Sequence, residues 1–304
     1  MDQVLKAEQS TLTMGIIYGL MAALLWGAWP VVSSLGLQNQ TLTPYDITAL
    51  RFGVAGTILL PLILKRGFKG IGLPGGLLFA FGAGAPYMLL TVTGLNFAPA
   101  SHMGIIAPSC MMTLSTIGGW FILGDRPDRN RLLGLGVIIL GVALLGWSGL
   151  AMAGDNQWMG HLLFVAGGGC WACYTVGTKY FKADPLHATA LVAVLSMVIY
   201  LPLYFIFGDP QIFVAPIKET LFQAAFQGIG SAVLALLFYT KAVALLGAAK
   251  GAVFAALVPG IAVILALPAL GEIPTTIEII GVSIVTIGMV GALGLIKGNK
   301  KKST

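Results

Sequence analysis

The sequence predicts an all-α membrane protein of ten transmembrane helices, arranged as two inverted five-helix repeats with both termini in the cytoplasm. Of the 304 residues, 57% are hydrophobic and 9% are charged, whereas about 25% of an ordinary soluble domain is charged. The mean hydropathy is +0.92, and one membrane span needs about 20 apolar residues. The chain therefore has room for roughly ten crossings with short connections, and its composition excludes a soluble enzyme.

Apolar runs between charged or turn-rich breaks define the predicted helices. Their ranges are 14–35, 45–64, 74–94, 99–122, 132–150, 160–180, 187–207, 221–240, 248–269 and 276–296. The first run is longer than the apolar core of a signal peptide and leads into no soluble domain. We therefore expect it to stay in the protein as a helix.

The positions of the basic residues predict the orientation. With a cytoplasmic N-terminus, fifteen of the 17 Lys and Arg residues fall in cytoplasmic segments, Lys218 falls on the opposite side, and Arg51 lies within the second helix. Lys and Arg are enriched in the cytoplasmic loops of membrane proteins, so both termini are predicted to be cytoplasmic. The basic tail, Lys297 to Lys302, is expected to lie against anionic lipid.

No disulfide, metal, cofactor or nucleic-acid partner is expected. Cys110, Cys170 and Cys173 all lie in apolar stretches, which favours packing roles over a disulfide framework or a zinc site. The basic residues are scattered between apolar runs and form no patch for a polyanion. The expected partners are a small-molecule substrate and the lipid bilayer, and the sequence leaves a monomer or a homodimer open.

An internal duplication divides the chain into two halves. The segment Gly124-Asp125-Arg126-Pro127 matches Gly271-Glu272-Ile273-Pro274, displaced by 147 residues, and each segment is followed by two further matching glycines, Gly134 and Gly141 in the first half, Gly281 and Gly288 in the second. Because each half holds an odd number of helices, the second half crosses the membrane in the opposite sense. Such inverted repeats support alternating access around a site near mid-membrane.

The duplication sets the expected division of the chain. The predicted segments are a cytoplasmic N-terminal segment 1–13, a first five-helix repeat 14–150, a second repeat 151–296 and a basic tail 297–304. The carboxylates of the repeated loops, Asp125 and Glu272, are expected to cap the helices that follow them, since a carboxylate is favourable at a helix N-terminus.

These features resemble the EamA-type branch of the drug/metabolite transporter superfamily. The resemblance rests on Trp26-Gly27 and Trp171-Ala172 in the first helix of each half, Arg51 in the second helix, Pro108 and Pro259 in the fourth and ninth helices, and the paired loops. It implies two EamA-like repeats and a secondary transporter that works in export. We expect the substrate to be a small polar metabolite such as an amino acid, and the membrane to be a bacterial inner membrane. Pro108 and Pro259 are expected to kink their helices, one helical turn out of register.

Mid-membrane aromatic and polar side chains are the predicted substrate site. Trp and Tyr usually gather at the membrane interfaces, yet Trp26 and Trp171 fall near the centres of their helices. The predicted substrate-binding residues are Trp26, Trp29, Ser33, Tyr87, Thr91, Ser109, Trp171, Tyr174, Gln227, Ser231 and Tyr239. The alternative is that these aromatic side chains only pack helices together and that the hydroxyl groups bond to their own backbone.

The predicted gating or coupling residues are Asp46, Arg51 and His102. Asp46 and Arg51 are five residues apart, a spacing that does not favour a direct ion pair, and interface anchoring is the alternative for both. His102 opens the fourth predicted helix and is able to titrate near neutral pH. His161 and His187 are interpreted as interface histidines. Because no Asp or Glu is predicted at mid-helix, facilitated diffusion or exchange is as consistent with the sequence as proton antiport.

Other functions stay open at this stage. A carrier of sugars suits an aromatic site, whereas a carrier of organic phosphates or nucleotide sugars would need Lys or Arg converging on the cavity. Only Arg51, Lys241 and Lys250 are eligible for that role. A membrane-embedded enzyme lacks a Ser/His or paired-carboxylate set at mid-depth, and a non-transporting sensor would show binding without flux. The absence of a phosphate-binding loop motif indicates that energy comes from gradients.

Overall fold

The computed structural model describes residues 2–38, 41–151 and 156–293, and every regular element in these ranges is helical. The predicted basic tail lies outside the described residues. The elements are α1 (Asp2–Gln38), α2 (Pro44–Arg66), α3 (Gly72–Ala83), α4 (Ala85–Gly94), α5 (Ala100–Leu123), α6 (Arg129–Ala151), α7 (Gln157–Tyr180), α8 (Pro185–Phe207), η1 (Gln211–Phe213), α9 (Ile217–Ala224), η2 (Ala225–Leu234), α10 (Ala235–Leu246), α11 (Ala248–Ala256), α12 (Val258–Leu270) and α13 (Thr276–Ala292).

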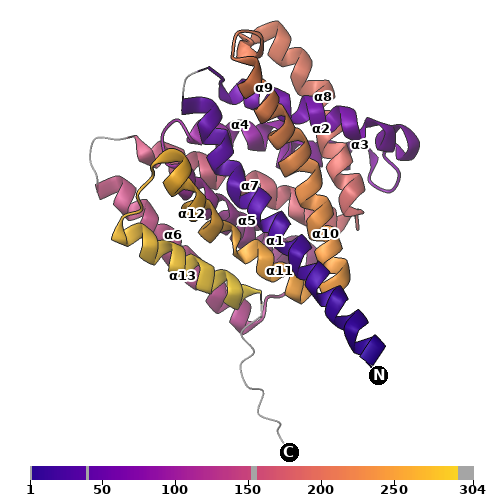
Figure 1. Cartoon of the computed structure of the whole chain (residues 1–304), viewed down its shortest axis with the longest axis vertical. Coiled ribbons are helices and arrows are strands. Elements are labelled where there is room, and N and C mark those ends of the chain that lie inside the picture. Colours follow the sequence, from indigo (N-terminus) through magenta and orange to yellow (C-terminus); the bar gives the residue numbers. More distant parts are fainter. Residues whose placement is uncertain (1, 39–40, 152–155, 294–304) are drawn as a thin grey trace, which may run out of the picture.

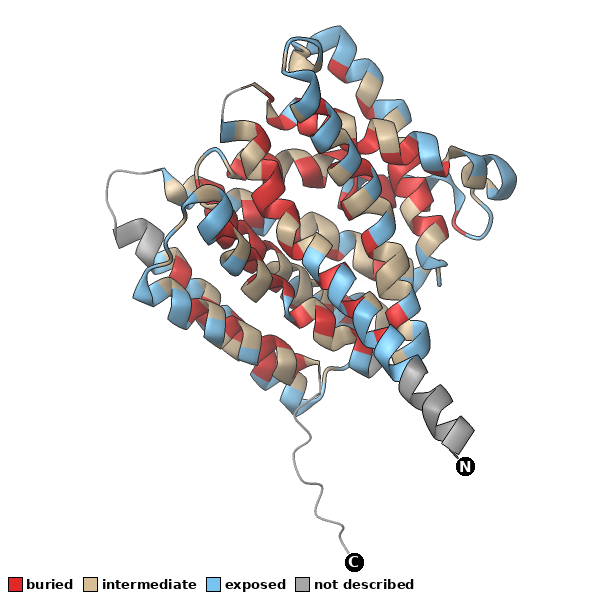
Figure 2. Ribbon diagram, viewed as in Figure 1, coloured by how far each residue is buried: buried red, intermediate tan, exposed pale blue. Residues whose placement is uncertain are grey.

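Within these ranges, nine helical segments are long and apolar enough to cross a membrane, and α13 is a shorter apolar helix. Many large apolar side chains point away from the bundle: Leu64, for example, is 77% exposed and Phe121 is 79% exposed. Figure 2 shows buried residues where helices meet and exposed residues along the periphery. Because such an apolar exterior is stable only in lipid, the chain is an integral membrane protein and the predicted all-α class is confirmed.

Three of the membrane segments are not continuous α-helices. The third predicted helix is broken at Gly84, just before Pro86, and the ninth is broken at Leu257, just before Pro259. A proline has no N–H to donate and its ring excludes the preceding turn, which explains both positions. By contrast, α5 continues through Pro108. The eighth segment runs from α9 through η2 into α10, and η2 is a π-helix, a geometry that is often found at functional sites.

The helices of the two halves interleave. The main contacts of the first helix of each half are related by exchange of the repeats: α1 packs on α10 and α12, whereas α7 packs on α3, α4 and α5. Two further pairs, α2 with α8 and α6 with α13, each join equivalent helices of the two halves, so exchange of the repeats leaves these pairs unchanged. Figure 1 shows α6 and α13 side by side at one edge of the bundle. The interface between the halves therefore runs through the centre of the molecule.

The repeated glycines meet at the edge formed by α6 and α13. A Cβ atom on Gly134 would lie 2.7 Å from the carbonyl oxygen of Gly288, and one on Gly141 would lie 3.0 Å from that of Gly281. Each repeated glycine thus faces the non-equivalent glycine of the other half, Gly134 with Gly288 and Gly141 with Gly281. Small residues permit this close approach of two helix backbones in a membrane.

The carboxylates of the repeated loops do not cap the helices that follow them, so that prediction is wrong. Asp125 pairs instead with Lys179 at 2.7 Å, and Asp128 Oδ1 accepts the backbone N–H of Arg131 near the start of α6. Glu272 accepts two backbone N–H groups at the start of α5 rather than of α13. In each loop the next helix is capped by a residue that lies closer to it in sequence, Asp128 for α6 and Thr275 for α13. Asp125 and Glu272 therefore contact other parts of the chain.

Candidate functional site

Buried polar side chains from α1, α2 and the eighth membrane segment form a cluster that we call the central polar layer. Its members are Trp29, Ser33, Arg51, Gln223, Gln227 and Ser231. Gln227 is at its centre: its side-chain amide donates to Ser33 Oγ at 2.9 Å and to Gln223 Oε1 at 3.2 Å. Trp29 Nε1 donates to Gln227 Oε1 at 2.9 Å. Gln223 also donates to the carbonyl oxygen of Val32 at 2.7 Å. The layer joins the two halves through hydrogen bonds.

Arg51 is the charged member of this layer. Its Nη1 donates to Ser231 Oγ at 2.8 Å, and its Cζ lies 5.5 Å from the ring centroid of Trp29. The residue is 8% exposed. Among the described residues, no carboxylate pairs with it. A guanidinium carries five N–H donors in a fork that matches a carboxylate, and a charge inside a membrane marks a functional site by default.

Four aromatic side chains continue from this layer across the molecule, and we call them the aromatic row. The ring centroids of Trp29 and Tyr87 are 5.7 Å apart, those of Tyr87 and Trp171 are 4.8 Å apart, and those of Trp171 and Tyr174 are 5.6 Å apart. The row crosses from α1 through α4 to α7 and so joins the first helices of both halves. It presents π-faces and polar tips at the interface of the repeats.

Several predicted site residues lie elsewhere. Trp26 packs against Tyr239 with ring centroids 5.2 Å apart, in a pair separate from the aromatic row. The hydroxyl groups of Thr91 and Ser109 donate to carbonyl oxygens four residues earlier in their own helices, at 2.8 and 2.6 Å. These contacts agree with the alternative of backbone bonding for the two hydroxyls.

Sequence reasoning missed Gln223. It lies four residues before Gln227, is 1% exposed, and completes the hydrogen bonds of that amide. Two glutamines four residues apart in an apolar segment share one helix face, and this spacing was the signal that could have found it.

Asp46 anchors one end of the bundle and does not pair with Arg51. Its Oδ2 accepts the backbone N–H of Thr43 at 2.7 Å, within a capping box at the start of α2. Its Oδ1 accepts the Tyr204 hydroxyl and the backbone N–H of Gln211, the latter at 2.9 Å. The carboxylate is fully buried. It therefore joins α2 to the end of α8 and to η1, across the two halves.

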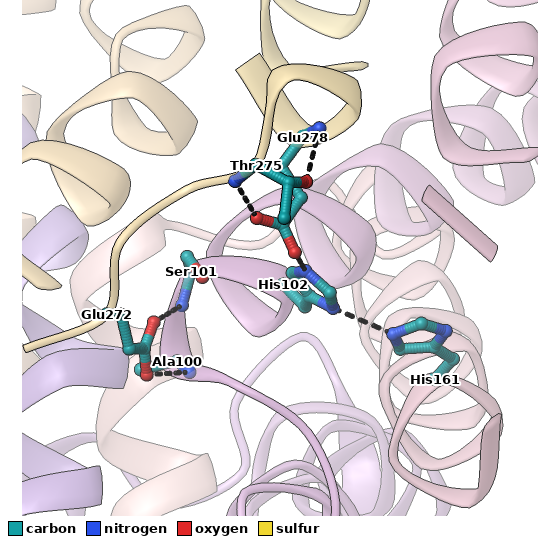
Figure 3. Close-up of polar contacts among 7 residues, drawn as sticks. All are labelled: Ala100, Ser101, His102, His161, Glu272, Thr275 and Glu278. Carbon is teal, nitrogen blue, oxygen red and sulfur yellow. Dashed lines mark hydrogen bonds and ion pairs between the residues drawn. The ribbon is translucent and has the colours of Figure 1, made fainter. Parts of the chain in front are cut away.

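His102 is buried and belongs to a cluster of titratable groups that sequence reasoning did not assemble. Figure 3 shows the side chain of His102 between those of Glu278 and His161. Its Nε2 lies 2.6 Å from Glu278 Oε1, and its Nδ1 lies 2.9 Å from His161 Nε2. We call these three residues the His–His–Glu cluster. They come from α5, α7 and α13, which are distant in sequence, so no local pattern could have indicated the cluster.

Glu272 adds a further contact beside this cluster. Its two carboxylate oxygens accept the backbone N–H groups of Ala100 and Ser101, at 2.8 and 3.0 Å (Figure 3). These N–H groups begin α5 and have no partner within the helix. The cluster and Glu272 thus bind the start of α5, in the first half, to α7, α13 and the loop before α13, in the second. We call this end of the bundle the His102 end.

The opposite end, which we call the Lys179 end, has looser contacts between the halves. Arg66 pairs with Asp184 at 3.3 Å and Lys179 with Asp125 at 2.7 Å, with all four side chains at least half exposed. A cleft of about 470 Å³ lies at this end. Its lining residues are Tyr174, Thr178, Lys179, Lys182, Ala183 and Pro185. Because Tyr174 also belongs to the aromatic row, the cleft reaches one end of that row.

The exposed Asp125–Lys179 pair is expected to contribute little to stability. The hydrogen bond from Lys179 lowers the pKa of Asp125, so any stabilisation is present above the pKa of the unfolded chain and is lost as the pH falls through the lowered pKa. Because solvent screens this pair, Asp125→Asn should shift the melting temperature at pH 7 by less than about 2 °C. Asp184→Ala should lower it more, since Asp184 also caps α8. Equal decreases would contradict this reading.

Among the described residues, no group of His, Cys, Asp and Glu side chains has the arrangement of a metal site. A membrane-embedded helical bundle with interleaved halves and a polar, aromatic interface has the construction of a solute carrier. Models of protein families agree: residues 13–147 and 158–294 each match the EamA-like transporter family. The chain belongs to this family, which confirms the resemblance found in the sequence.

The individual proteins similar to this chain share only a modest fraction of its residues. An uncharacterized transporter, YyaM, of Bacillus subtilis is 27% identical over 84% of this chain and 86% of its own length. A putative ribose uptake protein, RbsU, of Staphylococcus epidermidis is 28% identical, over 44% of this chain and 47% of its own length. One solved crystal structure aligns with a TM-score of 0.64 at 20% identity, over 95% of this chain and 99% of that one. This last likeness concerns the fold alone.

Proposed function

We propose that this protein is a secondary transporter that exports a small metabolite bearing a carboxylate, such as an amino acid, across a bacterial inner membrane by alternating access. The substrate would bind at the interface of the halves, between the central polar layer and the aromatic row. The N- and C-termini would lie in the cytoplasm, where the Lys179 end would then face.

The proposed substrate class rests on the buried guanidinium of Arg51. Its partners are the hydroxyl of Ser231 and the ring of Trp29, and no carboxylate among the described residues pairs with it. A substrate carboxylate would complete this site through charge-assisted hydrogen bonds. The faces of Tyr87 and Trp171 would accommodate the ammonium group or an apolar side chain of an amino acid.

Ribose or another sugar is the second candidate, favoured by the name of the relative that matches 44% of this chain and by the aromatic faces beside Gln227. A neutral sugar would leave Arg51 without a counter-charge. An organic phosphate is supported less, because Arg51 is the only cationic side chain found in the central polar layer. The test below identifies the substrate for either direction of transport.

Counterflow into proteoliposomes would test this function. Vesicles preloaded with unlabelled mixtures of amino acids, ribose and sugar phosphates should accumulate a labelled amino acid. Trp171→Ala should reduce the initial rate at least about tenfold, because it removes the centre of the aromatic row. Trp120→Ala is the matched control, since Trp120 is 40% exposed on the periphery of α5 and should leave the rate nearly unchanged.

Three other results of the counterflow experiment would each contradict part of the proposed function. Accumulation of ribose alone would replace the proposed substrate class with sugars. Accumulation that Trp171→Ala leaves intact would place the substrate away from the aromatic row. If no compound accumulated in vesicles that contain folded protein, the carrier proposal for these substrate classes would be wrong.

A further inference from the structure

We propose that His102, His161 and Glu278 form a binding site for a single proton, and that the bound proton holds the His102 end of the bundle closed. The proposal rests on the proposed function only for the motion that opens this end. It does not depend on which solute is carried.

The first support is the geometry of the His–His–Glu cluster. The side chain of His102 is 1% exposed and that of Glu278 is 16% exposed, while His161 is buried. Both ring nitrogens of His102 are engaged, one with Glu278 at 2.6 Å and the other with His161 at 2.9 Å (Figure 3). An imidazole held in this way has no nitrogen left for bulk water, so its protonation is tied to these two partners.

The number of protons follows from the donors that the contacts require. With Glu278 ionised, His102 Nε2 carries a hydrogen that it donates to the carboxylate. The contact between the two histidines then needs one hydrogen, supplied either by His161 Nε2 or by His102 Nδ1. In the first case both rings are neutral, whereas in the second His102 carries the added proton. Two charged rings would oppose N–H to N–H, so the cluster accepts one proton and no more.

The charges around the cluster set the direction of the effect. Without the added proton the cluster carries one negative charge, and with it the net charge is zero. Glu272 brings a second carboxylate to this end. Among the described residues at this end, the neighbouring α1, α4, α6 and α12 contribute no Asp, Glu, Lys, Arg or His. Protonation therefore removes the net negative charge of a cluster that no basic side chain of these neighbours balances, which favours the closed arrangement.

The contacts of the cluster cross between the two halves. His102 lies in the first half, on α5, and both of its partners lie in the second, on α7 and α13. Separating the start of α5 from α13 would break the contact with Glu278 and expose the groups to water. Because the closed arrangement holds the proton in an ion pair and the open one does not, low pH shifts the population toward closure by linkage.

Distances between two spin labels would test the proposal without a substrate. The labels would be placed at Asn96→Cys and Ile273→Cys, both exposed in the loops before α5 and α13, after replacing Cys110, Cys170 and Cys173 with alanine. Double electron–electron resonance in lipid nanodiscs should show a short and a long distance. The short-distance fraction should fall as the pH rises from about 5 to about 8, the range in which histidines titrate, by at most about tenfold per pH unit for one linked proton.

The variant Glu278→Gln should remove this pH dependence, because a neutral side chain leaves no carboxylate to hold the added proton on His102. Glutamine suits the same capping-box position, so the start of α13 should remain intact. His187→Asn is the matched control: His187 is a buried histidine at the Lys179 end, bonded to the carbonyl oxygen of Gly67 at 2.9 Å. It should leave the pH dependence as in the wild type.

Three results would overturn the proposal: distances in the wild type that do not change with pH, a short-distance fraction that rises with pH, or a pH dependence that survives Glu278→Gln. Should Glu278→Gln fail to give a monodisperse protein, His161→Asn tests the same site from α7 and should also flatten the pH profile. Because the readout needs no transport, failure to carry the proposed substrates would not imitate any of these results. A single distance at every pH would show that the His102 end does not open and would contradict alternating access itself, whereas two distances in a constant ratio would contradict only the proton site.

Discussion

Arg51→Gln is expected to reduce counterflow of a carboxylate-bearing substrate at least about 25-fold, the largest effect of any single substitution in the site. Removing one partner of a buried charge pair costs about 2–5 kcal/mol, and each 1.4 kcal/mol is about tenfold. The guanidinium lies against Trp29 and Ser231 in the wild type, so glutamine would keep a polar group there while removing the charge. Initial rates in proteoliposomes, with the amount of folded protein matched, would measure the loss.

Two controls separate recognition of the carboxylate from a general effect on folding. Arg51→Lys keeps the charge but loses the bidentate fork, so the rate should be intermediate. Arg66→Gln removes an arginine from the exposed end of the same helix, where its partner is Asp184, and should leave the rate nearly unchanged. A decarboxylated amine should compete poorly in the wild type. Equal competition by the amine and its parent amino acid would refute carboxylate recognition by Arg51.

Gly134→Ala is expected to destabilise the protein by about 1–3 kcal/mol, because the added methyl group overpacks the crossing of α6 and α13. A Cβ atom at this position would lie 2.3 Å from the backbone nitrogen of Ala292 and 2.7 Å from the carbonyl oxygen of Gly288. These are backbone atoms, so relief requires the two helices to move apart. Thermal unfolding in detergent would measure the decrease.

Gly136→Ala is the matched control for this prediction. Gly136 is exposed on the same helix, and a Cβ atom there would have no atom of another helix within 4 Å. Alanine has the higher helix propensity by up to about 1 kcal/mol, so this variant should be as stable as the wild type or more so. If both variants unfolded alike, the close approach of α6 and α13 would not be what requires glycine at position 134.

The site was only partly predictable. Trp29, Tyr87, Trp171, Tyr174 and Gln227 were predicted as site residues from their depth and polarity, and the structure brings them together. Trp26 was selected for the same reasons, yet it pairs with Tyr239 outside the aromatic row. Depth along a helix is readable from sequence, whereas the direction in which a side chain points within a bundle depends on which helices surround it.

The amino-acid sequence is enough to predict a helical membrane protein that is built from two repeats of one family. These properties depend on composition, on the length of apolar runs and on recurring local motifs such as the glycine–acid–proline loops, all of which can be read along the chain. Which polar groups meet depends instead on the packing of the whole bundle. The His102–Glu278 contact joins residues 176 positions apart, and Glu272 caps a helix of the other half. Such pairings depend on how interleaved helices pack, and no local pattern specifies that packing.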